Sequence, residues 1–211
     1  MNSSKIYNMS FTAGSAMLNE THAVATALLE CGGDWERTRE LTFRDNLMQK
    51  NKVSSYKRYF ALMKQRIETL NAEELQMLVS GNMAARRVLV LLAICKAHPF
   101  VYDFIVDNVR ESFYNLEGKI TQANFNEFYN EKKFEHPELE QVSELTVAKM
   151  RQVILRILEQ TEIIESSKTG VLHRPYISGT LEKLVVKDSP KWLGIYLYSN
   201  EEIRNLSDLY V

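Results

Sequence analysis

Cysteine is scarce in this sequence, and its spacing excludes a common kind of metal site. Cys31 and Cys95 are the two cysteines among 211 residues, and they lie far apart. Neither belongs to a CxxC pair or to a Cys/His ligand spacing, so we expect no structural zinc and favour a reducing, cytoplasmic setting. The four histidines also lack a partner at metal-ligand spacing, and we expect no metal and no cofactor. They are His22, His98, His136 and His173.

Long hydrophobic runs are missing as well. The most apolar run covers only residues 88–95, whereas a membrane-spanning helix needs about 20 residues. The start of the chain lacks a basic-then-apolar leader. Hydrophobic residues make up 45% and charged residues 25% of the chain, with 8 glycines and 4 prolines, which is typical of a globular protein with a buried core. We therefore expect no membrane contact.

Assembled catalytic motifs are absent from the sequence. It contains no Walker loop, GxGxxG, HExxH or GxSxG pattern. The paired glutamates Glu73-Glu74 and Glu201-Glu202 stand at expected helix starts, where the helix dipole accounts for them. The sequence thus indicates a protein that is not an enzyme and has no small-molecule substrate.

What the chain does have is a marked separation of charge. The formal net charge is −1, yet residues 50–66 hold six basic and no acidic side chains. Residues 111–144 hold eight glutamates against three lysines. Such a distribution can present a basic face to a polyanion. The alternative is a set of solvated surface charges.

Helical signals cover most of the chain. Asp34 is an expected N-cap for a helix from Trp35. Asn71 with Glu74 is expected to form a capping box for the helix that directly follows Asn71. Residues 82–97 are apolar nearly all round after Arg87, as in the central helix of a bundle. We expect residues 1–12 to begin as a loose polar arm.

Residues 53–70 show a clear amphipathic period. Tyr56, Tyr59, Phe60, Met63, Ile67 and Leu70 share one arc at 100° per residue. Small and basic side chains at the start and on the outer face fit a helix that lies against phosphates. The candidate ligands are Lys52, Ser54, Ser55, Lys57, Arg58 and Lys64. The alternative is a surface helix whose lysines face water and whose aromatics only pack.

Residues 136–176 follow the order of a winged helix-turn-helix. We expect a short helix after Pro137, a turn at residues 143–145 and a longer helix from Thr146. Two β-prone runs, residues 163–165 and 171–173, would form the wing around a turn at 166–170. A further strand is expected at residues 192–198 from its alternating apolar side chains.

The helix from Thr146 has two distinct faces. Its apolar face holds Val147, Met150, Val153, Ile154, Ile157 and Leu158, and the opposite face holds Lys149, Gln152 and Arg156. A recognition helix would turn that polar face to the major groove. Arg151 falls at the flank and is a weaker candidate. In the wing, phosphate contacts are expected from Lys168, His173 and Arg174. Winged helices also serve as protein–protein modules, so this pattern does not decide function.

Four segments together resemble the BrxA family, a component of BREX phage-exclusion systems. They are YNMSFTAGSAMLNET, GDWERTRELTFRDNLMQKNKVSSYKR, LVSGNMAARRVLVLLAICKAHPFVYDFIVDNVRESFY and HPELEQVSELTVAKMRQVILRILEQTEII, within residues 7–186. The resemblance implies a mostly helical protein with a helix-turn-helix-like N-terminal part similar to the NusB fold and a C-terminal winged helix. It also implies double-stranded DNA binding, a role in phage defence and other BREX proteins as partners. The family has no catalytic residues to carry over.

Two basic clusters at helix starts are similar to each other. In each, a hydroxyl residue precedes a lysine by three positions, as in Ser54 with Lys57 and Thr146 with Lys149. The sequence therefore predicts a mainly α fold with a helix-turn-helix-like region at 1–70, a central helical bundle at 71–135 and a winged helix-turn-helix at 136–211. The leading functional interpretation is a non-catalytic, double-stranded DNA-binding BREX component. A protein–protein scaffold that uses the acidic 111–144 region or the wing is the alternative, and NusB-like RNA binding is the third.

Overall fold

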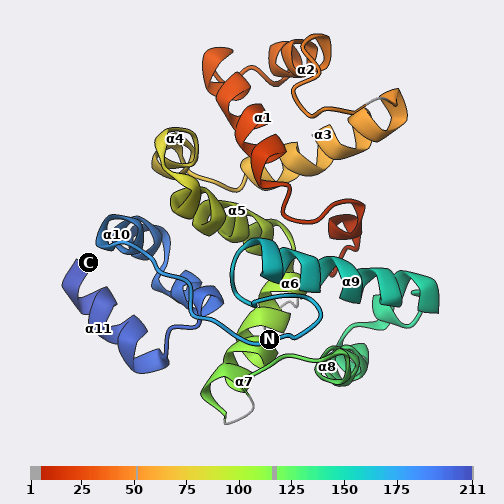
Figure 1. Ribbon diagram of the computed structural model, residues 1–211, viewed down its shortest axis with the longest axis vertical. Coiled ribbons are helices and arrows are strands. Elements are labelled where there is room, and N and C mark those ends of the chain that lie inside the picture. The colour runs from red at the N-terminus through yellow and green to blue at the C-terminus, as the bar shows by residue number, and fades with distance from the viewer. Residues whose placement is uncertain (1–5, 51, 116–117, 211) are drawn as a thin grey trace.

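A computed structural model describes residues 6–50, 52–115 and 118–210, and within these ranges the protein is helical (Figure 1). The α-helices are α1 (Leu18–Glu30), α2 (Trp35–Arg44), α3 (Val53–Ile67), α4 (Ala72–Ser80), α5 (Met83–Ala97), α6 (Pro99–Asp103), α7 (Arg110–Tyr114), α8 (Gln122–Glu135), α9 (Glu144–Gln160), α10 (Gly179–Asp188) and α11 (Asn200–Tyr210). The 3-10 segments are η1 (Ser10–Ala13), η3 (Pro137–Leu139) and η4 (Pro190–Tyr196), and η2 (Phe104–Val109) is a π-helix. The mainly α prediction is confirmed.

Capping residues begin several helices where the sequence predicts. Asp34 accepts hydrogen bonds from the amides of Glu36 and Arg37 at the start of α2. Asn71 and Glu74 form the expected capping box of α4. Ser143 caps α9, which begins at Glu144, two residues before the expected start at Thr146. These local bonds satisfy amides that have no partner inside the helix.

The predicted winged helix-turn-helix is wrong. The described ranges contain no strand, and the two wing runs meet only at an isolated bridge between Ile164 and Leu172. Pro137 begins a 3-10 turn rather than an α-helix, so the first helix of the motif is missing too. A two-stranded hairpin is marginal by itself. Ile163, Ile164 and Leu172 are buried, so these runs serve the core instead of projecting from it.

The strand expected at residues 192–198 is also wrong, because residues 190–196 form η4 and Leu197 follows with a φ of 65°. A half-buried strand needs alternating exposure. Here Ile195, Tyr196, Leu197 and Tyr198 are all buried, so the alternation in sequence reflects no exposed face.

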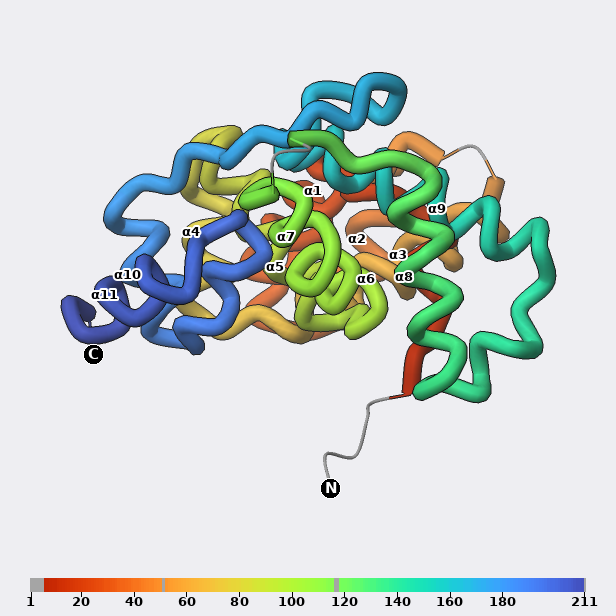
Figure 2. The backbone as a smooth tube through the Cα atoms, turned by 90° about the horizontal axis from the view of Figure 1, so that it is seen from below, coloured from red at the N-terminus to blue at the C-terminus, as the bar shows by residue number. Residues whose placement is uncertain are grey.

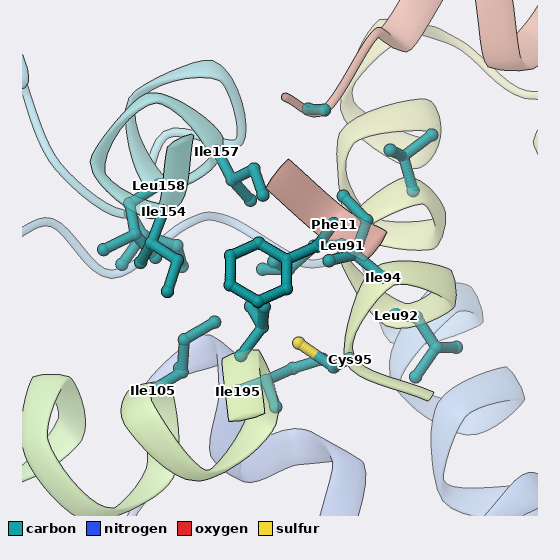
Figure 3. Close-up of a cluster of buried hydrophobic side chains, with 14 of the residues drawn as sticks. Phe11, Leu91, Leu92, Ile94, Cys95, Ile105, Ile154, Ile157, Leu158 and Ile195 are labelled. Carbon is teal, nitrogen blue, oxygen red and sulfur yellow. The ribbon is translucent and has the colours of Figure 1, made fainter. Parts of the chain in front are cut away.

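The described part of the N-terminal arm, residues 6–12, is packed rather than loose. The hydroxyl of Tyr7 donates to Asp103 Oδ2 at 2.5 Å, and its ring stacks on His136 with centroids 3.7 Å apart. Phe11 is fully buried. Figure 3 shows Phe11 between Leu91 and Ile94 of α5 and Ile157 of α9. The arm therefore closes the core between these two helices.

Helix α5 is central, as predicted, and residues 88–95 are all buried. The apolar face of α9 packs against η1, and Ile154, Ile157 and Leu158 point toward the same buried cluster as Leu91 and Ile94 of α5 (Figure 3). Within the described ranges, no single helix is long and apolar enough to cross a membrane, and α5 with residues 99–114 passes that test only as a pair bent by 116°. Figure 2 shows α10 and α11 at one end of the molecule and the α8–α9 connection at the other.

Candidate nucleic-acid interface

The exposed face of α9 borders a groove of about 570 Å³. The opposite wall comes from Tyr59 of α3 and from the end of η1 with the residues that follow it, which include Thr12 and Ser15. Gln122 at the start of α8 and Ser167 complete the lining. The groove thus joins α9 to α3, the two helices that carry the basic clusters.

The charge of this groove, which we call the α9–α3 groove, is of one sign. Lys149, Arg151 and Arg156 are its charged lining residues, and its lining among the described residues includes no Asp or Glu. A second cleft of about 360 Å³ lies between α7 and α8 and has the opposite character. It is lined by one lysine and five carboxylates: Lys132, Asp107, Glu111, Glu127, Glu131 and Glu135. Polyanions would be attracted to the first surface and repelled by the second.

The polar face predicted for α9 is exposed in the groove. Lys149 Nζ donates to Gln152 Oε1 at 3.1 Å, and Arg156 forms an ion pair with Glu159 at 3.2 Å. Glu159 also accepts from the Ser167 hydroxyl, which lowers the pKa of its carboxyl. Because exposed pairs contribute less than about 1 kcal/mol, Arg156 can exchange this partner for a phosphate.

Two other candidates of α9 are engaged within the protein. Arg151 is half-buried and donates to Asn126 Oδ1 of α8 at 3.1 Å, which agrees with its expected place at the flank. The Thr146 hydroxyl shares a 2.9 Å hydrogen bond with that of Ser143 in the N-cap of the helix. Thr146 therefore supports the helix start and lies outside the lining of the groove.

The basic side chains of α3 divide between two sides. Lys50, which precedes α3, and Arg58 each lie with their charge 5.1 Å from the centre of the ring of Tyr59, which lines the α9–α3 groove, although neither belongs to that lining. Lys57 and Lys64 instead line another groove, shared with α2. Residues seven apart, such as Lys57 and Lys64, point to nearly the same side of a helix. Adjacent residues, such as Lys57 and Arg58, point in directions about 100° apart. Lys52, Ser54 and Ser55 stand at the start of α3, outside both linings.

Arg66 belongs to the basic stretch 50–66 but lies fully inside the protein. Its guanidinium donates to the carbonyl oxygens of Ser15 at 2.7 Å and Gly14 at 2.9 Å. Burial lowers the pKa of Arg66 to about 9. Arg66 thereby holds the segment that forms one wall of the α9–α3 groove. Its position seven residues after Tyr59, on the apolar arc, is the sequence signal for this placement.

The wing candidates end in different surroundings. Lys168 and His173 are exposed. Arg174 bonds Glu202 of α11 at 2.6 Å and lies 3.9 Å from the centre of the Tyr198 ring. These contacts place Arg174 in a junction within the protein, and a phosphate would have to displace Glu202 to reach it.

Comparison with known proteins identifies relatives over most of the chain. A family model named BrxA matches residues 5–189. A BREX protein BrxA from Escherichia coli O9:H4 (strain HS) is 25% identical and covers 78% of this chain and 76% of its own length. Another from Paramagnetospirillum magneticum (strain ATCC 700264 / AMB-1) is 25% identical over 89% of this chain and 94% of its length. The fold also matches the crystal structure of an uncharacterized protein from Magnetospirillum magneticum, with a TM-score of 0.80, 23% identity and coverage of 92% of this chain and 98% of that one.

Proposed function

This chain belongs to the BrxA family, and on that premise we propose that it is a non-catalytic, double-stranded DNA-binding component of a BREX phage-defence system. The relatives supply the BREX context through their names. The observation that carries DNA binding is the α9–α3 groove, whose charged lining residues are all basic.

The dimensions suggest how duplex and protein fit together. A groove of about 570 Å³ is too small to enclose a duplex. It suits the sugar–phosphate backbone of one strand, while the exposed face of α9 enters the major groove, which is about 12 Å wide. Lys149 and Arg156 then contact phosphates or guanine edges, and Gln152 can read adenine. The acidic cleft on the far side of α8 favours one orientation of the backbone through repulsion.

A titration of labelled duplex at several salt concentrations tests this proposal. Binding through phosphates requires the logarithm of the association constant to fall linearly with the logarithm of salt concentration, by about 0.9 per phosphate neutralised. Replacing Lys149→Glu and Arg156→Glu together is expected to weaken binding at least about tenfold and to reduce the salt slope by about two. Arg58→Glu is expected to weaken it as well, because the Arg58 guanidinium lies 5.1 Å from the ring of Tyr59, which lines the groove.

Lys183→Glu is the matched control, since Lys183 is exposed on α10, away from the α9–α3 groove. If the control and the α9 variants lost the same affinity for duplex, net charge and not the α9–α3 groove would account for binding. Unchanged affinity in the α9 variants would remove α9 from the interface. Structured RNA that competes as well as duplex would support the RNA-binding alternative.

A scaffold function has its own supporting observation in the acidic cleft between α7 and α8. A basic segment of another BREX protein would complement its five carboxylates. No retention of duplex at low salt, together with co-purification of such a partner, would favour the scaffold over the DNA-binding proposal.

A further inference from the structure

An open apolar groove lies between α2 and α3, on the side of α3 away from Tyr59. Its volume is about 600 Å³, and we call it the α2–α3 groove. Four aromatic side chains line it: Trp35, Phe43, Tyr56 and Phe60. Tyr56 and Phe60 are buried and form the floor, Trp35 is half-buried, and Phe43 remains 51% exposed; Val53 at the end of the groove is 55% exposed. Exposed aromatic surface in a concave site is characteristic of a place where another polypeptide binds.

The edges of this groove carry charge. Lys57 and Lys64 lie along the α3 edge, and Glu36, Arg39 and Glu40 lie along α2. Glu36 is paired with Arg39 at 2.7 Å, whereas Lys64 has a longer 3.7 Å contact with Glu68 and lies 5.3 Å from the centre of the Trp35 ring. The α3 edge is therefore basic. An occupant must combine an apolar anchor with acidic neighbours to match both features.

This chain itself carries such a segment at the connection between α8 and α9. Phe134, in the last turn of α8, is 91% exposed, more than any other large hydrophobic residue in the described ranges. Leu145 at the start of α9 is 85% exposed. Residues 131–145, which we call the acidic tip, contain five glutamates against two lysines. One of those lysines, Lys132, is paired with Asp107 at 3.0 Å.

We propose that the α2–α3 groove binds the acidic tip of a second copy of this chain. Phe134 of one chain packs against Phe43 and Trp35 of the other, and the adjacent glutamates face Lys57 and Lys64. The two surfaces differ, so the contact is heterologous and builds either a closed ring or a linear array. The contact is small, which makes the association weak and dependent on concentration.

This self-association goes beyond the proposed DNA binding and does not rest on it. Helix α3 separates the two grooves, with Tyr59 on one side and Lys57 and Lys64 on the other. A second copy bound in the α2–α3 groove leaves the α9–α3 groove open.

Sedimentation velocity without DNA, from micromolar to submillimolar protein, tests the proposal. The weight-average sedimentation coefficient of the unaltered chain is expected to rise with concentration, and added salt is expected to reduce the rise. Phe134→Glu and Phe43→Glu should each sediment as a monomer. Val53→Glu provides a second groove variant at an exposed position, in case Phe43→Glu disturbs the contact of Phe43 with Tyr56. Tyr176→Glu, at a residue that is 83% exposed elsewhere, is the matched control and should behave as the unaltered chain.

The most informative experiment mixes the tip variant Phe134→Glu with a groove variant, Phe43→Glu or Val53→Glu. Each retains one intact surface, so the mixture should form a particle of two chains and nothing larger. An unaltered chain that stays monomeric at every concentration would overturn the proposal. Association that persists in both the tip and groove variants, or a mixture that stays monomeric, would overturn it as well.

Discussion

His98 lies buried at the junction of α5 and α6, with neither ring nitrogen hydrogen-bonded within the described ranges. Burial, and then the nearby Arg66 guanidinium, lowers the pKa of His98 to about 3. In an unfolded chain the pKa is about 6.5. The folded protein thus keeps a neutral ring while the unfolded chain takes up a proton. Stability falls as pH drops from about 6.5 toward 3, by about 1.4 kcal/mol per unit.

Replacing His98→Leu should remove this part of the pH dependence at little cost near neutrality, because no hydrogen bond to the ring is lost. The free energy of unfolding in urea, measured at about pH 7 and about pH 5, is the test. Between about pH 7 and about pH 5, the free energy of unfolding of the unaltered chain should fall by about 2 kcal/mol more than that of the variant. Protonation of carboxylates affects both proteins and cancels in the comparison. Equal pH dependence would show that His98 is not neutral when folded.

At the scale of elements, three helices meet at one buried cation. Lys96 of α5 forms ion pairs with Glu74 of α4 at 2.8 Å and with Asp188 at the end of α10 at 2.9 Å. The Glu74 side chain is fully buried, and that of Asp188 is 27% exposed. Lys96 therefore joins the C-terminal part of the chain to the central bundle.

The substitution Lys96→Met is expected to destabilise the protein by about 3 kcal/mol, because it leaves Glu74 buried without its charged partner. Asp188→Asn should cost less than about 1 kcal/mol, since Asp188 is partly solvated. Chemical denaturation of both variants measures the difference. Similar losses in the two would mean that the buried Glu74–Lys96 pair is not the dominant contact.

At the scale of the whole molecule, buried residues from Tyr7 to Tyr198 form one hydrophobic cluster. Figure 3 shows Ile154, Ile157 and Leu158 of α9 directed at Phe11, α5 and Ile105, all outside residues 136–211. The apolar face of α9 is therefore covered by other parts of the chain. The predicted boundary at residue 136 stays a prediction, and this packing gives a reason to test it.

A fragment of residues 136–211 is expected not to fold alone, because it exposes the apolar face of α9 to water. Circular dichroism at the helical band should show much less helix per residue than in the full chain. Loss of the signal with a broad thermal transition would agree with one cooperative core. A fragment that melts sharply with native-like helicity would instead support an independent C-terminal domain.

The sequence by itself determined most helices and the faces of the long ones. Caps such as Asp34 and Asn71 and the apolar period of α3 and α9 act between residues a few positions apart, so they can be identified from neighbours alone. The polar face of α9 followed from the same period and is exposed as expected.

Only the tertiary structure decided what lies opposite each face. Short apolar runs such as residues 163–165 and 192–198 fit a strand or a buried turn equally well, and the packing around them selected the latter. The packing also turned Arg58 toward Tyr59 and Lys57 toward the α2–α3 groove, and placed Arg66 inside against Gly14 and Ser15. The partners in such contacts lie far apart in sequence, as with Tyr7 and Glu138, 131 positions apart. Burial depends on these distant residues, which a local pattern does not contain.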